Sequence, residues 1–480
     1  MSTDHLMLSV SGCRGIVGTS LTPQVISSFA ATVGTILTQS PDLKRGQRPI
    51  VVVGRDGRSG SPMVRDAARA GLLASGCDVI DIGVAMTPTC GVAVDSFNAH
   101  AGIVLTASHN PQQWNGLKVL LRSKGKNSGI LGSNACAPSK ALADSIIARY
   151  RTDGPCLVDW TNLGDVDDAS QEAIYAHAGR TAQALDKLKI TKKIEKAGFK
   201  VVLDSVNGAG RIISPGWLEA FGCKVTRVGD DDSGIFPHTP EPTADNLVFL
   251  GKLVKKAKAH VGFAQDPDAD RLAIIDERGT YIGEEYTLVL ATMALGELGA
   301  LKKGQKLVVN LSTSRMIEDV AAKYGCSVVR SAVGEANVVE MMKTLKSPIG
   351  GEGNGGVIWP AVTYIRDSLG AMGLVLGLMA HMKKPLSEIV RTVPSYAIVK
   401  RKVECAQRAE AQQAVEKIAE FYSDEQVDRQ DGTWVNFKDR KAWLHVRASN
   451  TEPIMRLIAE APSTAEASSI LDEAARVISK

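Results

Sequence analysis

The apolar positions of this chain recur as three copies of one pattern: strand, helix, strand, strand. Each copy opens with a basic residue and an apolar run of strand length, and a helix-length segment separates that run from a Gly-Cys-x-Val motif. A further short run then leads into a polar loop. The opening runs are Arg48–Val53, Lys200–Asp204 and Lys306–Asn310; the Gly-Cys motifs begin at Gly76, Gly222 and Gly325; the last runs begin at Ala99, Ala259 and Pro348.

The repeat predicts three tandem, related α/β domains, each with a mixed sheet flanked by helices. A chain of 480 residues is too long for one ordinary domain. Its last part does not continue the repeat: strand-like runs near Trp434 and Lys441 precede a helical segment at Thr464–Lys480, which indicates a smaller α+β domain. We expect domain boundaries at 1–162, 163–276, 277–394 and 395–480.

Composition limits the classes of protein to which this chain can belong. A net charge of +4 is small for this length, so no nucleic-acid partner is expected. No secretory signal is visible, and the longest apolar run, Leu369–Met382, is too short to span a bilayer. Eight cysteines without tight pairing favour a reducing compartment, and Cys77, Cys223 and Cys326 share one strand position as small buried residues. We expect a cytoplasmic protein without a membrane partner.

The third strand of each copy leads into a loop with distinctive chemistry. These loops are Thr106–Pro111 (Thr-Ala-Ser-His-Asn-Pro), Asp266–Arg271 (Asp-Pro-Asp-Ala-Asp-Arg) and Gly351–Gly356 (Gly-Glu-Gly-Asn-Gly-Gly). Ligands of open α/β sheets bind at the carboxyl ends of the strands. A Ser-His pair alone would indicate only a polar turn, but three equivalent loops predict one shared cleft.

The aspartate loop predicts a metal site. Asp266, Asp268 and Asp270 place three carboxylates within five residues, and two unit charges ~4 Å apart repel by about 4 kcal/mol at an effective dielectric near 20. A calcium-binding EF-hand is the rival, but its sixth position needs Gly and is Arg271 here. The flanking segments also read as strands rather than helices. Mg²⁺ fits better than Ca²⁺ because few protein ligands leave coordination positions open for phosphate.

Two other segments are candidate anion sites. Arg447–Pro453, with Arg456 just beyond, offers a guanidinium fork, hydroxyls and backbone N–H groups suited to a phosphate. An ordinary capped turn is the alternative, because Ser, Asn and Thr also cap helices. Near the start, Ser9–Gly18 places Arg14 between glycines, which is a weak signal by itself.

Together these segments resemble the α-D-phosphohexomutase superfamily along essentially the whole chain. The Ser108 loop is similar to the family's phosphoserine signature, and the loops at Asp266, Gly351 and Arg447 are similar to its magnesium, sugar and phosphate loops. Further family-like segments are Val53–Ser59, Asp204–Gly210 and Phe236–Pro242. The resemblance implies four domains in a heart shape around a central cleft.

The resemblance also implies a reaction and a set of site residues. A phosphoserine enzyme would interconvert hexose 6-phosphate and hexose 1-phosphate through a hexose 1,6-bisphosphate, which also serves as activator, with Mg²⁺ offsetting charge. The partners would be small hexose phosphates, and the protein a monomer or homodimer. The catalytic residues implied are Ser108, Lys118, Arg14, Arg271 and His109; the metal ligands are Ser108, Asp266, Asp268 and Asp270; the substrate-binding residues are Glu352, Asn354, Gly334, Arg447, Ser449, Asn450, Thr451 and Arg456.

The chain departs from the family pattern at two positions. Many members end the sugar loop with histidine, where this chain has Gly356, and some have histidine where Glu335 stands. The second proton-transfer residue is therefore open. We favour glucosamine phosphate as substrate, with phosphomannomutase or phosphoglucomutase activity as the alternative, and a sugar phosphatase or a non-catalytic sugar-phosphate binder as weaker ones. The glycines of the sugar loop are expected to leave space beside the ring and to relax discrimination at C2.

Overall fold

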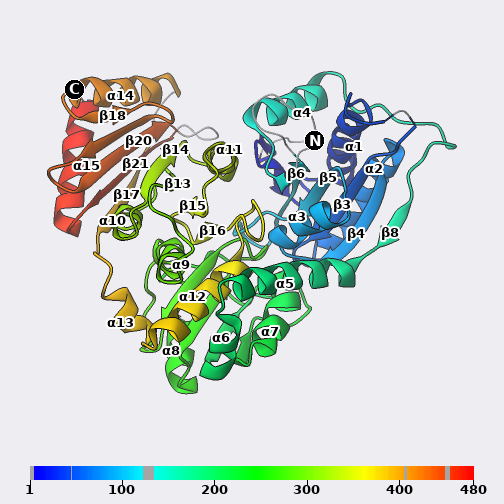
Figure 1. Ribbon diagram of the computed structural model, residues 1–480. Coiled ribbons are helices and arrows are strands. Elements are labelled where there is room, and N and C mark those ends of the chain that lie inside the picture. The colour runs from blue at the N-terminus through cyan, green and yellow to red at the C-terminus, as the bar shows by residue number, and fades with distance from the viewer. Residues whose placement is uncertain (1–4, 45, 123–133, 405–407, 449–453, 480) are drawn as a thin grey trace.

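The computed structural model describes residues 5–44, 46–122, 134–404, 408–448 and 454–479 of the chain. Four α/β units follow one another along an arc, from the first (blue) through the second (green) and third to the last (red) (Figure 1). Three of them contain the repeat expected from the apolar pattern.

The second and third units have the same sheet. In each, three strands are parallel in the order second–first–third, and a fourth strand returns antiparallel beside the third. The orders are β10-β9-β11-β12 and β14-β13-β15-β16. The strands are β9 (Lys200–Asp204), β10 (Lys224–Val228), β11 (Val261–Gln265), β12 (Leu272–Asp276), β13 (Lys306–Asn310), β14 (Ser327–Ser331), β15 (Gly350–Glu352) and β16 (Gly356–Ile358).

The first unit contains the same four strands as β4-β3-β5-β6 and extends the sheet at both edges, which confirms the predicted repeat of mixed α/β sheets. Strands β1 and β2 are added beside β6, and β8 beside β4. The elements are β1 (Met7–Ser9), β2 (Gly12–Ile16), α1 (Pro23–Thr38), β3 (Ile50–Arg55), α2 (Ser61–Ala74), β4 (Asp78–Val84), α3 (Thr87–Ser96), β5 (Ala101–Leu105), β6 (Trp114–Arg122), β7 (Ala135–Cys136), α4 (Lys140–Thr152) and β8 (Val166–Asp168).

The pairing of β8 favours a later position for the first proposed domain boundary. A division at residue 162 would assign β8 to the second unit, whereas β8 pairs with β4 in parallel register, Val79 opposite Val166. We therefore propose that the first domain extends through Asp168, and we retain the proposed divisions near residues 276 and 394.

The second and third units share one hydrophobic core, although the repeat predicts two domains. Helix α12 is apolar around its whole circumference and buried from Ser368 to Met379, since it packs between α9 of its own unit and helices α5 and α6. A Cβ at Gly373 or Gly377 would meet the side chains of Leu185 or Ile190, so both glycines allow the close approach. The helices of these units are α5 (Ser170–Lys187), α6 (Thr191–Ala197), α7 (Gly210–Ala220), α8 (Val248–Ala257), α9 (Tyr286–Glu297), α10 (Met316–Lys323), α11 (Glu335–Leu345), α12 (Ser368–Met382) and α13 (Leu386–Val390).

The last unit is an antiparallel sheet of order β17-β21-β20-β19-β18, as expected for a separate α+β domain. This sheet also contacts the third unit. At that contact the fully buried Glu460 accepts hydrogen bonds from the Arg315 N–H (2.8 Å) and from the Trp443 indole of its own sheet (2.6 Å). The elements are β17 (Ala397–Glu404), α14 (Arg408–Phe421), β18 (Gln426–Asp428), β19 (Thr433–Phe437), β20 (Ala442–Ala448), β21 (Ile454–Ala461) and α15 (Thr464–Ser479).

The structure also bears on the expectations for the three repeat cysteines and for the longest apolar run. Cys77, Cys223 and Cys326 are buried thiols, as predicted, and each immediately precedes one of the equivalent strands β4, β10 and β14. Within the described residues, no helix combines the length and apolar character needed to cross a membrane, and the apolar run Leu369–Met382 is the buried helix α12.

Candidate active site

All four units line one cavity of about 590 Å³. His109 enters from the first unit, Glu241 from the second, Glu352 from the third and Arg447 from the last. The predicted shared cleft is therefore present, and residues distant in the chain meet in it.

Ser108 lies at the carboxyl end of β5 with φ 51, a left-handed conformation that is rare for serine. Its N–H donates to Thr106 Oγ1 at 2.9 Å, and its carbonyl accepts from the buried Arg58 guanidinium. Arg58 also donates to the carbonyls of Asn110 and Pro111. These bonds hold the turn and present Ser108 Oγ to Asp266 Oδ2 at 2.9 Å.

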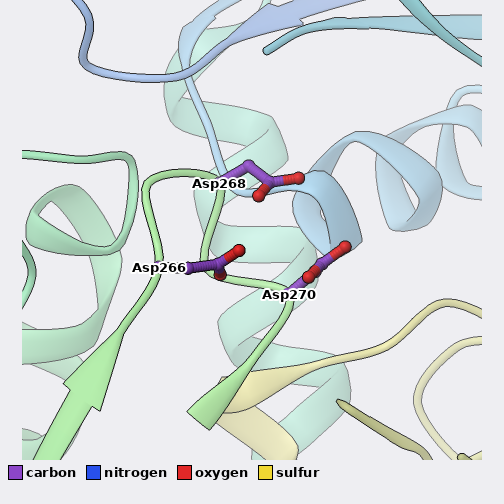
Figure 2. Close-up of side chains that lie close together, drawn as sticks. All are labelled: Asp266, Asp268 and Asp270. Carbon is purple, nitrogen blue, oxygen red and sulfur yellow. The ribbon is translucent and has the colours of Figure 1, made fainter. Parts of the chain in front are cut away.

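The three aspartates lie on the turn between β11 and β12, which confirms strands rather than EF-hand helices on either side. Their carboxylates lie on the same side of the turn, and one oxygen of each lies within 4.8 Å of the others (Figure 2). Asp268 Oδ1 and Asp270 Oδ1 are buried and have no hydrogen-bond partner among the described residues. Buried carboxylate oxygens without donors fit a hard divalent cation.

The electrostatics of the cluster also favour a cation. Burial, together with the charges of Asp268 and Asp270, raises the pKa of Asp266 well above its ordinary value. Burial would also raise the pKa of Asp270, but the charges of Arg366, Lys118 and Arg271 outweigh it and lower that pKa. The neighbouring cations therefore outweigh burial at Asp270 but not at Asp266, and a divalent cation would favour the ionised form of both carboxylates.

Lys118 and His109 flank this cluster in opposite protonation states. Burial alone would lower the pKa of Lys118, but Asp270, Asp268 and Glu335 raise it, and Nζ lies 2.8 Å from Asp270 Oδ2. Burial, with the charges of Arg271 and Arg14, lowers the pKa of His109 to about 3. Lys118 is therefore held as a cation, and His109 is neutral near pH 7.

Arg14 and Arg271 add positive charge beside His109. Arg14 lies on β2, opposite Gly116 of β6. The Nε atoms of both guanidiniums are buried without a hydrogen-bond partner among the described residues. A phosphate group could accept hydrogen bonds from these buried donors.

The sugar loop presents a carboxylate that its neighbours hold firmly. Glu352 Oε1 accepts from Asn310 Nδ2 at 2.9 Å and the Gly334 N–H at 3.3 Å. Glu352 Oε2 accepts from Arg366 Nη1 at 2.6 Å. Asn354 also lines the cavity. A carboxylate can accept about four hydrogen bonds, so Glu352 retains capacity for a ligand hydroxyl.

The glycines of this loop do not leave the space that the sequence suggested. A Cβ at Gly353 would overlap the Glu285 carboxylate, and one at Gly356 would overlap Arg366 Cδ. At Gly355, φ is +85 and a Cβ would lie 2.6 Å from the Leu272 carbonyl. The expectation was wrong because the missing side chains make room for other parts of this protein rather than for a ligand.

The last unit contributes a row of cations. Arg456 on β21 is directly opposite Arg447 on β20 and Lys402 on β17, and all three line the cavity. Like charges in directly opposed positions are destabilising, and Asp431, 3.5 Å from Arg447, is the only ion-pair partner of the three among the described residues. The row therefore suits an anion. Ser449, Asn450 and Thr451 lie outside the described residues.

Three residues that sequence reasoning missed belong to the site. Arg366 bridges Asp270 and Glu352, Lys402 completes the cation row, and Thr87 donates to Asp268 Oδ2 at 2.5 Å. None lies in a distinctive motif. Lys402 could have been identified only from the antiparallel register of β17 and β21, which places it opposite Arg456.

Models of one protein family match almost the whole chain. Four models of the phosphoglucomutase/phosphomannomutase family match: domain I at residues 6–129, domain II at 179–279, domain III at 283–396 and the C-terminal domain at 399–477. The phosphoglucomutase/phosphomannomutase of Thermococcus kodakarensis is 34% identical over 96% of each chain. The phosphoglucosamine/phosphogalactosamine mutase of Sulfurisphaera tokodaii is 29% identical over 98% of this chain and 99% of its own.

Solved structures show the same fold. A phosphoglucomutase/phosphomannomutase family protein from Burkholderia thailandensis superposes with a TM-score of 0.77 over 98% of each chain, at 24% identity. Because the family models cover all four units and the identity with the archaeal relative extends over the whole length, this chain belongs to the α-D-phosphohexomutase superfamily and is an enzyme of the phosphohexomutase type.

Proposed function

We propose that this enzyme interconverts hexose 6-phosphate and hexose 1-phosphate, with glucosamine phosphate as the favoured substrate. The observation that carries the proposal is a serine in a left-handed conformation beside three aspartates, whose neighbour His109 lines the same cavity as a separate row of cations on the last unit. The first can exchange a phosphoryl group, while the second holds a phosphate that does not react. Mannose and glucose phosphates are the alternative substrates, since the Thermococcus kodakarensis relative is a phosphoglucomutase/phosphomannomutase.

In the proposed half-reaction, the bond between Ser108 Oγ and phosphorus breaks as a bond forms from a sugar hydroxyl oxygen to the same phosphorus. The proton of that hydroxyl passes to neutral His109, the proposed base, which lines the cavity. Lys118, held as a cation, is the proposed acid that protonates Ser108 Oγ, and it acts as the base when the second phosphate returns to the serine. Arg14 and Arg271 are proposed to bind the transferred phosphoryl group, whose catalysis depends on positioning and charge. Mg²⁺ bound by Ser108, Asp266, Asp268 and Asp270 would offset the phosphoserine charge.

The hexose 1,6-bisphosphate intermediate is proposed to turn within the cleft, so that each phosphate takes its place at Ser108 in turn. Glu352, Asn354 and the Gly334 backbone are proposed to bind the sugar, and Arg447, Arg456 and Lys402 the distal phosphate, with Ser449, Asn450 and Thr451. Hydrolysis alone would need no second phosphate site, so the cation row favours a mutase over a phosphatase.

Sugar preference provides the direct test of this proposal. With Mg²⁺ and a trace of hexose bisphosphate, we expect glucosamine, glucose and mannose 1-phosphates all to give the 6-phosphate. Their kcat/KM values should lie within about a hundredfold, because Glu352 accepts from hydroxyls that these sugars share and a buried hydrogen bond to the wrong sugar costs ~1–3 kcal/mol. Release of free phosphate instead would support a phosphatase. A ten-thousandfold preference would contradict relaxed discrimination.

Loss of Arg447 should weaken binding of all sugar phosphates alike. Arg447→Ala removes a guanidinium from the cation row, and a charge-assisted hydrogen bond contributes about 1.5–3 kcal/mol. We expect KM to rise by about 10- to 100-fold for each sugar with kcat nearly unchanged, as for uniform binding. Arg440→Ala, at an exposed arginine that pairs with Glu466, is the control. A rise in KM for only one sugar would instead place Arg447 at the hydroxyls.

A further inference from the structure

Arg366 connects the aspartate loop to the sugar loop, because its two terminal nitrogens bind one carboxylate in each loop. Its Nη2 lies 2.6 Å from Asp270 Oδ2, and its Nη1 lies 2.6 Å from Glu352 Oε2. All three side chains are almost fully buried, at 9%, 0% and 6% exposure. A planar guanidinium can join two carboxylates in this way, whereas a lysine ammonium is a single point charge.

The environment of Arg366 leaves it little freedom. Its backbone N–H donates to Glu335 Oε1 at 3.0 Å, and its Nε lies 3.6 Å from Glu335 Oε2. The adjoining residue, Asp367, caps α12 by accepting from the N–H groups of Leu369 and Gly370. The side chain thus extends from a helix start fixed in the shared core and is held by three carboxylates.

Arg366 also fills the place beside Gly356. A Cβ at Gly356 would overlap Arg366 Cδ, and the backbone at Gly356 has no positive φ that would itself require glycine. The sequence departs from the histidine common at this position in the family, and in this chain the arginine from the next segment occupies the volume. Glycine at position 356 and arginine at position 366 therefore form one structural unit.

We propose that Arg366 is a positioning residue that couples metal binding at Asp270 to sugar binding at Glu352; this inference rests on the proposed function. A cation held by Asp270 would share the charge of that carboxylate and weaken its hold on Arg366. The guanidinium then binds Glu352 more strongly and fixes the orientation of its remaining acceptor sites for the sugar. Metal and sugar phosphate consequently bind with positive coupling, and by linkage each tightens the other by the same factor.

The coupling can be measured without turnover. Calorimetric titration of dephosphorylated wild-type enzyme with glucose 1-phosphate, with and without saturating Mg²⁺, gives the factor by which Mg²⁺ tightens binding of the sugar phosphate. Titration with Mg²⁺, with and without the sugar phosphate, gives the factor by which the sugar phosphate tightens binding of Mg²⁺. We expect both factors to be about tenfold, within the usual range for coupled sites. Arg366→Lys keeps the charge but cannot bridge both carboxylates, so its factor should fall to about twofold or less while the melting temperature changes little.

Gly356→Ala supplies a second route to the same result. The added Cβ displaces Arg366 without removing any charge, so the coupling factor should fall as in Arg366→Lys, and the double variant should fall no further. Arg456→Met is the matched control, because it removes a cation that contacts neither carboxylate: the affinity for glucose 1-phosphate should weaken while the tenfold coupling persists.

The outcomes separate this inference from the proposed function. If wild-type enzyme binds neither Mg²⁺ nor the sugar phosphate, the proposed function itself fails. If both bind with equal coupling in wild type, Arg366→Lys and Gly356→Ala, the mutase proposal stands and the role of Arg366 is overturned. Should one variant fail to fold, the other still decides the question, since Arg366→Lys changes the guanidinium itself and Gly356→Ala changes only the residue beside it.

Discussion

Ser108→Ala is expected to lower mutase turnover by about 10⁴-fold or more, the scale of loss when an enzyme loses its nucleophile. Ser108 Oγ is the atom presented to the aspartates, and within the described residues no other hydroxyl hydrogen-bonds to Asp266. Alanine cannot accept the phosphoryl group, so no bisphosphate can form. Rates measured with each hexose 1-phosphate, in the presence of bisphosphate, would show the loss.

The same variant should remain folded. Thr106 and Arg58 bind the backbone of residue 108 rather than its hydroxyl, so the turn keeps its hydrogen bonds. Mass spectrometry of purified wild type should find one phosphoryl group on the Ser108 peptide, absent from the variant. Ser59→Ala, at an exposed serine of the neighbouring loop, should retain full activity. Near wild-type turnover by Ser108→Ala would refute the proposed phosphoserine mechanism.

Removal of the metal should have the next largest effect. EDTA is expected to abolish turnover, and Mg²⁺ to restore it. Asp268→Asn should lower kcat/KM by about 10³-fold, since a cation at such a site contributes several kcal/mol to charge stabilisation. An amide can still accept from Thr87 Oγ1 but cannot offer an anionic oxygen in place of the unpartnered Oδ1.

Metal affinity should be measured together with activity. Mn²⁺ titration followed by electron paramagnetic resonance would report binding directly and should show weaker affinity in Asp268→Asn, with an unchanged far-ultraviolet circular dichroism spectrum. Asp232→Asn, at an exposed aspartate, provides the control. Full activity after exhaustive chelation would show that the three aspartates are a buried structural cluster and not a catalytic metal site.

The sequence determined the repeat and the loops that follow it. Runs of alternating strand and helix character are local patterns, and a loop after a parallel strand must lie at the carboxyl edge of its sheet. The sequence therefore predicts that Ser108, the three aspartates and Glu352 share one cleft. In the structure Ser108 hydrogen-bonds to Asp266, and its neighbour His109 lines the cavity that Glu352 also lines. The roles proposed for these residues, and for Asn354, Gly334 and Arg456, come from the resemblance to the family and remain predictions.

The tertiary structure alone decided how these parts are connected. Arg366 and Asp270 are 96 positions apart, and no local pattern predicts their contact. The same holds for Lys402, which joins Arg447 and Arg456 only through the register of three antiparallel strands. Burial on both sides of α12 joins the second and third domains through one large hydrophobic cluster. The glycines of the sugar loop showed this limit most directly, because a sequence reveals that a side chain is missing but only the packed fold shows which neighbour takes its place.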